Sequence, residues 1–260
     1  MNLFKRMYYR HILRHYAIKH DRWANITTEM QLLQGLSTLE RTRLRELSTV
    51  FLHQKQLTGV RLQINDEIRV TIAAQACLPI LDLGIGLLDG WADVIIYPDS
   101  FHVSRDVKDE YGIVHQTDSI LSGEAWSKGP LILSWAAIQH DMQSGQQGHN
   151  VIIHEIAHKL DMLNGWADGV PPLHLDMKGP QWTEALRSAY HHLQQRIEHH
   201  HRVCINPYAA SNPAEFFAVI SEYFFAAPTI LETQFPDVYK QFQLYYQQDP
   251  LKRQLVDGNA

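Results

Sequence analysis

Two histidines and a glutamate stand in the order His-Glu-x-x-His at His154, Glu155 and His158. At 3.6 residues per turn, side chains four positions apart lie on one face of a helix, so both imidazoles can reach a single cation. Glu155 projects beside that face, where a carboxylate can take a proton from a metal-bound water. The pattern therefore predicts a hydrolytic metal site, and with this histidine content it arises by chance only about 0.05 times per chain.

The neighbouring sequence predicts the helix that this spacing requires. Asn150 is a favourable N-cap residue, and Asn164-Gly165 favours termination of a helix. The apolar residues that can bury one flank of it are Val151, Ile152, Ile156, Leu160 and Leu163. In the alternative interpretation, the same helix forms but binds no metal. The motif is then two histidines on a partly exposed helix beside a charged residue.

A third ligand must come from elsewhere, because a catalytic zinc ion takes three protein ligands and leaves a fourth position for water. Asp161, three residues after His158, can reach the metal or can accept the second N–H of a ligating imidazole. Glu215 and Glu222 lie further along in an unusually apolar segment, where a buried carboxylate needs a partner.

Glu215 also fits a purely structural role. With Asn212 as N-cap and Pro213 at the first helical position, Glu215 falls at the third position, where it can close a capping box onto the backbone. The spacing alone favours ligand and cap equally, and Glu222 is a third option for the ligand.

The overall composition indicates an ordinary globular chain. Its 260 residues are 45% hydrophobic and 20% charged, which excludes disordered, collagen-like and coiled-coil classes. The net charge of -5 argues against direct binding of nucleic acid or of an anionic membrane. The longest apolar runs are too short to span a bilayer, so we expect no membrane segment.

Histidine is abundant, with 16 residues, and cysteine is scarce. The histidine-rich tract from His191 to His201 is best interpreted as a solvated helix end that can bind metal adventitiously. Cys77 and Cys204 belong to no CxxC pair, which argues against a thiolate zinc site or a disulfide framework. The residues from Met7 to His20 offer no apolar core of a secretion signal, so the expected compartment is the cytoplasm.

Periodicity divides the chain into helical ends and a middle with strands. Helices are expected at 36–57, 65–76, 79–88, 150–163, 182–199, 214–226 and 238–248. Short strands are expected at 94–97, 113–115 and 131–135. The prediction is an α+β protein with a small mixed sheet. A helical N-terminal part (1–90) packs on a core (91–260), and the two form one compact unit.

Two runs of sequence, 154–161 and 206–225, closely resemble the Mlc titration factor A (MtfA) family of bacterial zinc peptidases. The resemblance extends to 78–80, 94–98 and 245–251, so it covers most of the chain. A more distant similarity links the zinc-site pattern to the catalytic domain of anthrax lethal factor. The resemblance implies a zincin-like catalytic core of the gluzincin type, in which a glutamate on a later helix is the third ligand.

Matching positions assign individual roles. The resemblance implies one Zn²⁺ held by His154, His158 and Glu215. It also implies that Tyr208, which otherwise fits a turn position after Pro207, faces the same site. Asp161 would have a supporting role and not be a ligand.

The implied reaction is peptide hydrolysis, of the aminopeptidase type, by zinc-activated water. Glu155 would be the general base, and Tyr208 would donate a hydrogen bond to the oxyanion of the tetrahedral intermediate. The substrate peptide would lie along an exposed edge of the sheet, for which Gly129 to Trp135 is the expected strand.

The resemblance also implies a protein partner, the transcriptional repressor Mlc. Family members sequester this repressor and thereby relieve repression of glucose phosphotransferase genes. The alternative function is therefore that of a repressor-sequestering binding protein with weak or latent peptidase activity.

Overall fold

The structure is a computed structural model that describes residues 3–108, 114–121, 123–125, 129–143 and 148–257. Its N-terminal elements are α1 (Leu3–Tyr16), α2 (His20–Thr27), η1 (Gln31–Leu33), α3 (Thr38–Gln54), β1 (Gln56–Gly59), α4 (Asp66–Cys77) and η2 (Ile85–Leu88). Local signals explain where the longer helices begin. Ser37 and Glu40 form a reciprocal capping box at α3, and the Asn65 side chain caps α4.

One expectation for this part was wrong, and a second was confirmed except for the end of its helix. The expected helix at 79–88 is a series of turns that ends in η2, because Gly84 adopts φ +91°, which interrupts any helix. The expected helix at 36–57 ends at Gln54, and β1 follows directly. Strand β1 pairs with a strand beyond residue 90, so the sheet takes strands from both sides of the expected boundary.

The main sheet has four strands in the order β1-β2-β6-β5, formed with β2 (Asp93–Tyr97), β5 (Gly123–Ala125) and β6 (Leu131–Ser134). Strands β1, β2 and β6 run parallel, and β5 is antiparallel to β6. A separate antiparallel pair consists of β3 (Phe101–Lys108) and β4 (Val114–Leu121). Of the expected strand at 113–115, Ile113 lies outside the described residues. The sheet is mixed and small, and the fold is α+β.

The expected edge strand was wrong. Strand β6 has a neighbour on each side, β2 and β5, so it is internal. Among the strands that the structure describes, the edges are β1 and β5, and Trp135 already begins a helix. Sequence patterns did not indicate β5, because its three residues lack the apolar, β-branched character of a strand. It is a strand because its backbone pairs with β6.

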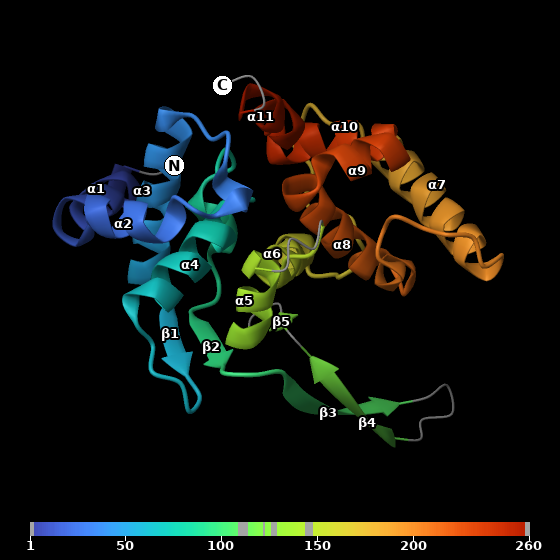
Figure 1. Ribbon diagram of the computed structural model, residues 1–260, viewed down its shortest axis with the longest axis horizontal. Coiled ribbons are helices and arrows are strands. Elements are labelled where there is room, and N and C mark those ends of the chain that lie inside the picture. Colours follow the sequence, from blue (N-terminus) through green and yellow to red (C-terminus); the bar gives the residue numbers. More distant parts are fainter. Residues whose placement is uncertain (1–2, 109–113, 122, 126–128, 144–147, 258–260) are drawn as a thin grey trace.

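The C-terminal part of the chain is helical and contains the helix with both histidines, α6. Its elements are α5 (Trp135–Gln143), α6 (Val151–Asp161), η3 (Met162–Asn164), α7 (Gly179–Glu198), η4 (Pro207–Ala210), α8 (Pro213–Ala226), α9 (Pro228–Gln234), α10 (Pro236–Tyr246) and α11 (Pro250–Asp257). Proline occupies one of the first two positions of α7, α8, α9 and α10, where its missing N–H costs no helical hydrogen bond. Helices α5 and α6 lie between the N-terminal helices and the group from α7 to α10 (Figure 1).

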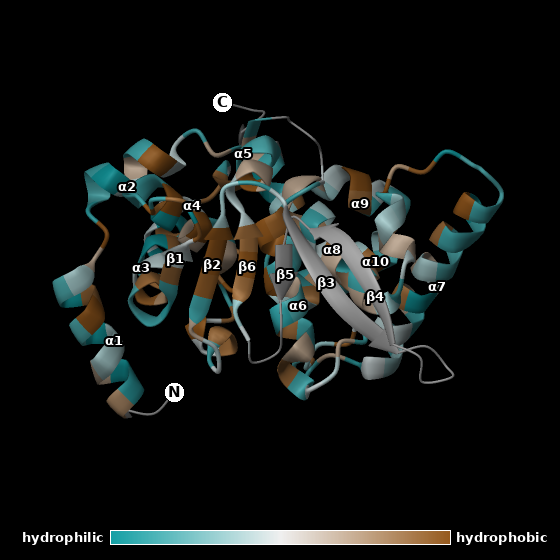
Figure 2. Cartoon of the chain, turned by 90° about the horizontal axis from the view of Figure 1, so that it is seen from below, coloured by the Kyte–Doolittle hydropathy of each residue, from teal (hydrophilic) through white to brown (hydrophobic). Residues whose placement is uncertain are grey.

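The core is continuous from the sheet to the C-terminal helices. Val94, Ile96, Leu131 and Leu133 are fully buried, and β2 and β6 stand out as apolar in Figure 2. Among the C-terminal helices, Trp182 stacks on Phe242 with ring centroids 5.5 Å apart. In the described residues, no helix combines the length and the apolar content that crossing a bilayer requires.

Candidate metal centre

The side chains of His154, His158 and Glu215 meet at one point between α6 and α8. The Nε2 atoms of the two histidines lie 3.1 Å apart, and Glu215 Oε2 lies 3.1 Å from His154 Nε2 and 3.3 Å from His158 Nε2. Within the described residues this is the one group of three metal-ligating side chains that comes together, and the tract at His199–His201 forms none. The structure thus brings together the three residues to which the sequence resemblance gave the ligand role.

These distances fit a tetrahedral ion. Bonds of about 2.0–2.2 Å at tetrahedral angles separate neighbouring ligand atoms by roughly 3.3 Å. The three atoms therefore match one face of such a site and leave the fourth position open. Open coordination is a property of catalytic metal sites and not of structural ones.

The chemistry of the donor set also favours a cation. Glu215 Oε2 is buried and receives no hydrogen bond of normal geometry from the described residues, although two ring nitrogens face it. Burial lowers the pKa of His154, but its close contacts with the carboxylates of Glu215 and Glu222 outweigh this effect and raise that pKa well above the usual value. Burial raises the pKa of Glu215, but the two imidazoles bring it well below the usual range. The site therefore stabilises positive charge beside an ionised carboxylate.

Helix α8 contacts His154 on both ring nitrogens. Glu222 Oε1 lies 2.8 Å from His154 Nδ1, while Glu215 faces Nε2. The other oxygen of Glu222 accepts a 2.6 Å hydrogen bond from the backbone N–H of Asn150, the N-cap residue of α6. A carboxylate at Nδ1 places the proton there and directs the Nε2 lone pair towards the metal position.

Asp161 does not make this imidazole contact. Its side chain is fully buried, and its Oδ2 accepts a 2.9 Å hydrogen bond from the N–H of Gly169. Burial raises the pKa of Asp161 to about 6. From the sequence, Asp161 was a candidate partner of a ligating imidazole and Glu222 a candidate ligand. In the structure the carboxylate that contacts the imidazole of His154 is Glu222. The available signal was the heptad spacing between Glu215 and Glu222, which places both on one face of a helix.

The contact between Asp161 and Gly169 joins the end of α6 to the beginning of α8. Gly169 has φ +78°, and a Cβ at this position would lie 2.5 Å from the carbonyl oxygen of Pro213, the first residue of α8. Only a glycine permits this approach without strain. Asp161 therefore helps to set the distance between the helix that carries the histidines and the helix that carries Glu215.

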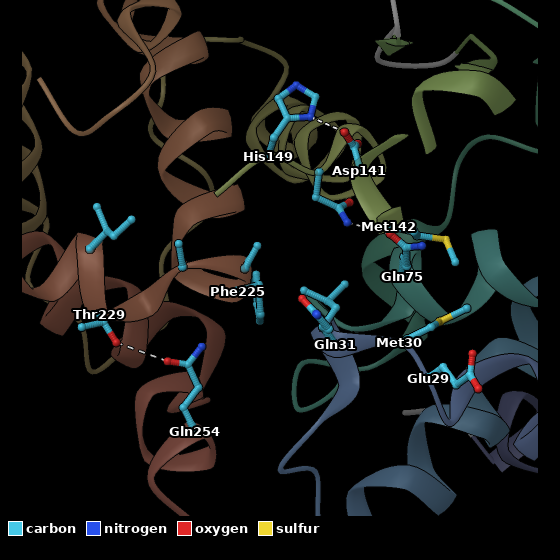
Figure 3. A pocket seen from close by; sticks show the side chains of 15 residues that line it. Glu29, Met30, Gln31, Gln75, Asp141, Met142, His149, Phe225, Thr229 and Gln254 are labelled. Atoms are coloured by element: carbon cyan, nitrogen blue, oxygen red, sulfur yellow. Dashed lines mark hydrogen bonds and ion pairs between the residues drawn. The ribbon is translucent and has the colours of Figure 1, made fainter. Parts of the chain in front are cut away.

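The N-terminus of α6 is fixed by α4 and α5. The Asn150 side chain caps Ile153 and donates to Gln75 of α4, and Asp141 of α5 accepts from the N–H of Val151. Asp141 also binds the ring of His149 (Figure 3). Gln75, Asp141, His149 and Asn150 line a pocket of about 290 Å³, which the three candidate ligands do not line. Its contribution to the metal centre is therefore the support of α6.

Glu155 lies on the same helix as the histidines and is buried. One turn later, Lys159 donates a 2.8 Å hydrogen bond to the carbonyl of Gly129, just before β6. Burial lowers the pKa of Lys159 to about 8, and the charge of Glu155 partly opposes this effect. Glu155 thus sits in a water-poor position directly after His154 in the helix, and its charge contributes to the raised pKa of that histidine. A carboxylate that acts on a metal-bound water needs such a position.

Tyr208 lies on the solvent side of the centre. It belongs to η4, its N–H is capped by the side chain of Asn206, and its side chain is half exposed. The ring centroids of Tyr208 and His154 are 6.2 Å apart. Tyr223 of α8 holds the preceding loop, because its hydroxyl accepts from the N–H of Asn206 and donates to the carbonyl of Cys204.

Comparison with known proteins agrees with a metallopeptidase site. The family model of the glucose-regulated metallopeptidases M90 matches residues 4–247, and the chain belongs to this family. It is 43% identical over 227 residues to the Mlc titration factor A of Pectobacterium atrosepticum, which covers 85% of this chain and 84% of that protein. The Mlc titration factor A of Escherichia coli has the same identity and coverage, and that of Shigella flexneri is 42% identical. Membership in a metallopeptidase family implies a metal, and the cluster at His154 offers a place for it.

Proposed function

We propose that this protein is a zinc-dependent peptidase of the gluzincin type, with a zincin-like catalytic core. The observation that carries the proposal is the convergence of His154 Nε2, His158 Nε2 and Glu215 Oε2 beside the buried Glu155. Two imidazoles and one carboxylate with an open fourth position are the donor set of hydrolytic zinc enzymes. Both cysteines are free, and neither belongs to the cluster, so no thiolate closes the site.

In the proposed mechanism each protein group has one task. A zinc ion, when bound, supplies Lewis acidity and lowers the pKa of its water towards about 7. Glu155 would accept a proton from the attacking water and deliver it to the leaving amine. Tyr208, at the exposed side of His154, donates a hydrogen bond to the oxyanion. Glu222 keeps the proton of His154 on Nδ1.

The proposed substrate is a peptide in extended conformation, bound beside the sheet. Strand β5 is an edge strand next to α6, so its backbone can pair with a further strand. Backbone pairing is independent of side chains and suits a peptidase. The proposed reaction type is that of an aminopeptidase, and this assignment rests on the family resemblance.

The proposed partner is the repressor Mlc. The curated relatives carry the name Mlc titration factor A, and the alignment covers most of both chains. Capture of this repressor would relieve repression of glucose phosphotransferase genes, in the cytoplasm. The second candidate function is sequestration of the repressor as the main activity, with weak or latent hydrolysis. The half-exposed Tyr208 and the open edge β5 leave room for either role.

The decisive experiment measures zinc content and peptide hydrolysis of Glu155→Ala. This variant should keep about one zinc per chain and lose hydrolysis, because the ligands remain and the base is gone. Full activity would refute the mechanism. His154→Ala should lose the metal, and if it keeps the metal, binding must be sought at His199–His201. Capture of the repressor by inactive Glu155→Ala would separate binding from hydrolysis.

A further inference from the structure

Positive charge is concentrated at the N-terminal end of the chain. Residues 3–20 contain five of the 23 lysines and arginines and no aspartate or glutamate, so the remainder carries a net charge of -10. Most of these cations belong to α1, which lies at one end of the molecule (Figure 2). The net charge of the whole protein therefore conceals a local basic surface.

Three arginines form a line along α1. Arg6, Arg10 and Arg14 follow one another at four-residue intervals, which places them on one side of the helix, and all three are exposed. None of them makes an ion pair within the described residues, whereas Lys5 pairs with Asp89 at 2.7 Å. Their charges are thus available to an external anion.

Apolar side chains lie beside this line and are directed away from the core. Phe4 is 78% exposed and Met7 is 60% exposed. The opposite side of α1, which includes the fully buried Ile12, packs against α3. Tyr8 and Tyr16 are also exposed, and such side chains combine an apolar ring with a polar tip.

We propose that the outer face of α1, formed by Phe4, Met7, Arg6, Arg10 and Arg14, binds the surface of an anionic lipid membrane. Arginines beside exposed apolar side chains are the pattern of helices that lie in the interface of a bilayer. The cations contact lipid phosphates, and the apolar side chains enter the boundary between headgroups and acyl chains. The metal centre lies on other elements, α6 and α8, so this contact does not use the peptidase site.

The apolar side chains favour a lipid surface over a nucleic acid. Phosphate contacts would explain the arginines, but they give no free energy for transferring Phe4 and Met7 out of water. A bilayer interface provides both a negative potential and an apolar layer.

The test is co-sedimentation of the full-length protein with vesicles of equal parts phosphatidylglycerol and phosphatidylcholine, at low salt. Each arginine at an anionic surface contributes about fivefold to binding, so Arg6→Gln/Arg10→Gln/Arg14→Gln should weaken it by on the order of 100-fold. The matched control removes three cations from the C-terminal part, as Arg187→Gln/Arg202→Gln/Lys240→Gln, and should bind as the wild type does. Phe4→Ser/Met7→Ser should weaken binding and leave its dependence on salt in place.

Several results would overturn this proposal. They are wild-type protein that stays in the supernatant, equal binding to pure phosphatidylcholine vesicles, and equal losses in the two triple variants. Binding to a DNA duplex without binding to vesicles would assign the face to another polyanion and would also refute it. His154→Ala should bind vesicles normally, so failure of the proposed peptidase function would not affect this result.

Discussion

The Nδ1 atom of His154 lies 2.8 Å from Oε1 of Glu222, a carboxylate 68 residues further along the chain. Glu222 is buried, and its other oxygen holds the first turn of α6 through the N–H of Asn150. One side chain therefore fixes both the helix and the ring that it presents. This arrangement makes Glu222 the residue that orients His154.

Glu222→Gln should weaken zinc binding by about 10- to 100-fold, because an amide can turn its NH₂ group to Nδ1 and no longer keeps the proton there. The dissociation constant for zinc, measured by competition with a chelator, tests this expectation directly. Glu232→Gln on α9 removes an exposed carboxylate and serves as the control. A zinc affinity equal to that of the wild type would show that Glu222 supports only the fold.

Tyr208→Phe should lower kcat by about 10²- to 10³-fold, the usual cost of removing one oxyanion donor. The ring near His154 remains, so zinc content and KM should change little. The matched control is Tyr190→Phe, which removes a hydroxyl that donates to the carbonyl of Ala210 in the same region. Similar kinetic losses in both variants would contradict the role of Tyr208.

Gly169→Ala should destabilise the protein more than Gly165→Ala does. Both glycines have positive φ, which costs another residue about 1–2 kcal/mol. At Gly165 a Cβ meets nothing within 4 Å, whereas at Gly169 it meets the carbonyl of Pro213 at 2.5 Å. Urea unfolding compares the free energies of unfolding of the two variants, and zinc titration shows the displacement of α8. Equal stability and equal zinc affinity would argue against the proposed spacing role of Gly169.

The buried ammonium group of Lys55 should make the free energy of unfolding depend on pH in the alkaline range. Its ammonium donates to the carbonyls of Leu88 and Trp91 and lies over the Trp91 ring. Burial lowers its pKa from 10.5 to about 8. Between these two values the unfolded chain holds a proton that the folded chain has lost. The free energy of unfolding should therefore rise as the pH increases from about 8 to 9. Above about 9 the effect is opposed by Cys77, because burial raises the pKa of its thiol from 9.0 and only the unfolded chain then loses that proton.

Urea unfolding at pH 8, 8.5 and 9 tests this dependence. Lys55→Met should lower stability throughout, because two buried carbonyls lose their donor, and should flatten the rise with pH. Part of the rise in stability with pH should remain in this variant, because the pKa of Lys159 is also lowered to about 8. Lys252→Met, at an exposed position, should leave the slope unchanged. A wild-type stability that falls between pH 8 and 9 would contradict the expectation.

Local sequence signals determined the two helices that form the candidate metal centre. Asn150 and Asn212 cap α6 and α8 as expected. Gly165, in a left-handed conformation, ends the helical segment formed by α6 and η3. Each signal acts within a few residues, through a hydrogen bond or a steric preference, so sequence alone reveals it. The four-residue spacing of His154 and His158 is equally local, and their Nε2 atoms meet as that spacing requires.

Tertiary structure decided the relations between distant segments. From the sequence, Glu215 could be either a capping residue or a metal ligand. In the structure its backbone N–H donates to the side chain of the N-cap residue Asn212, while its carboxylate faces the imidazoles. The sequence assigned no definite role to Asp161 or Glu222. In the structure α6 packs against α8, so that Glu222 contacts His154 and Asp161 contacts Gly169. The internal position of β6 likewise follows from its pairing with β5. These outcomes depend on how apolar faces from distant parts of the chain pack together, and periodicity within one segment carries no information about that register.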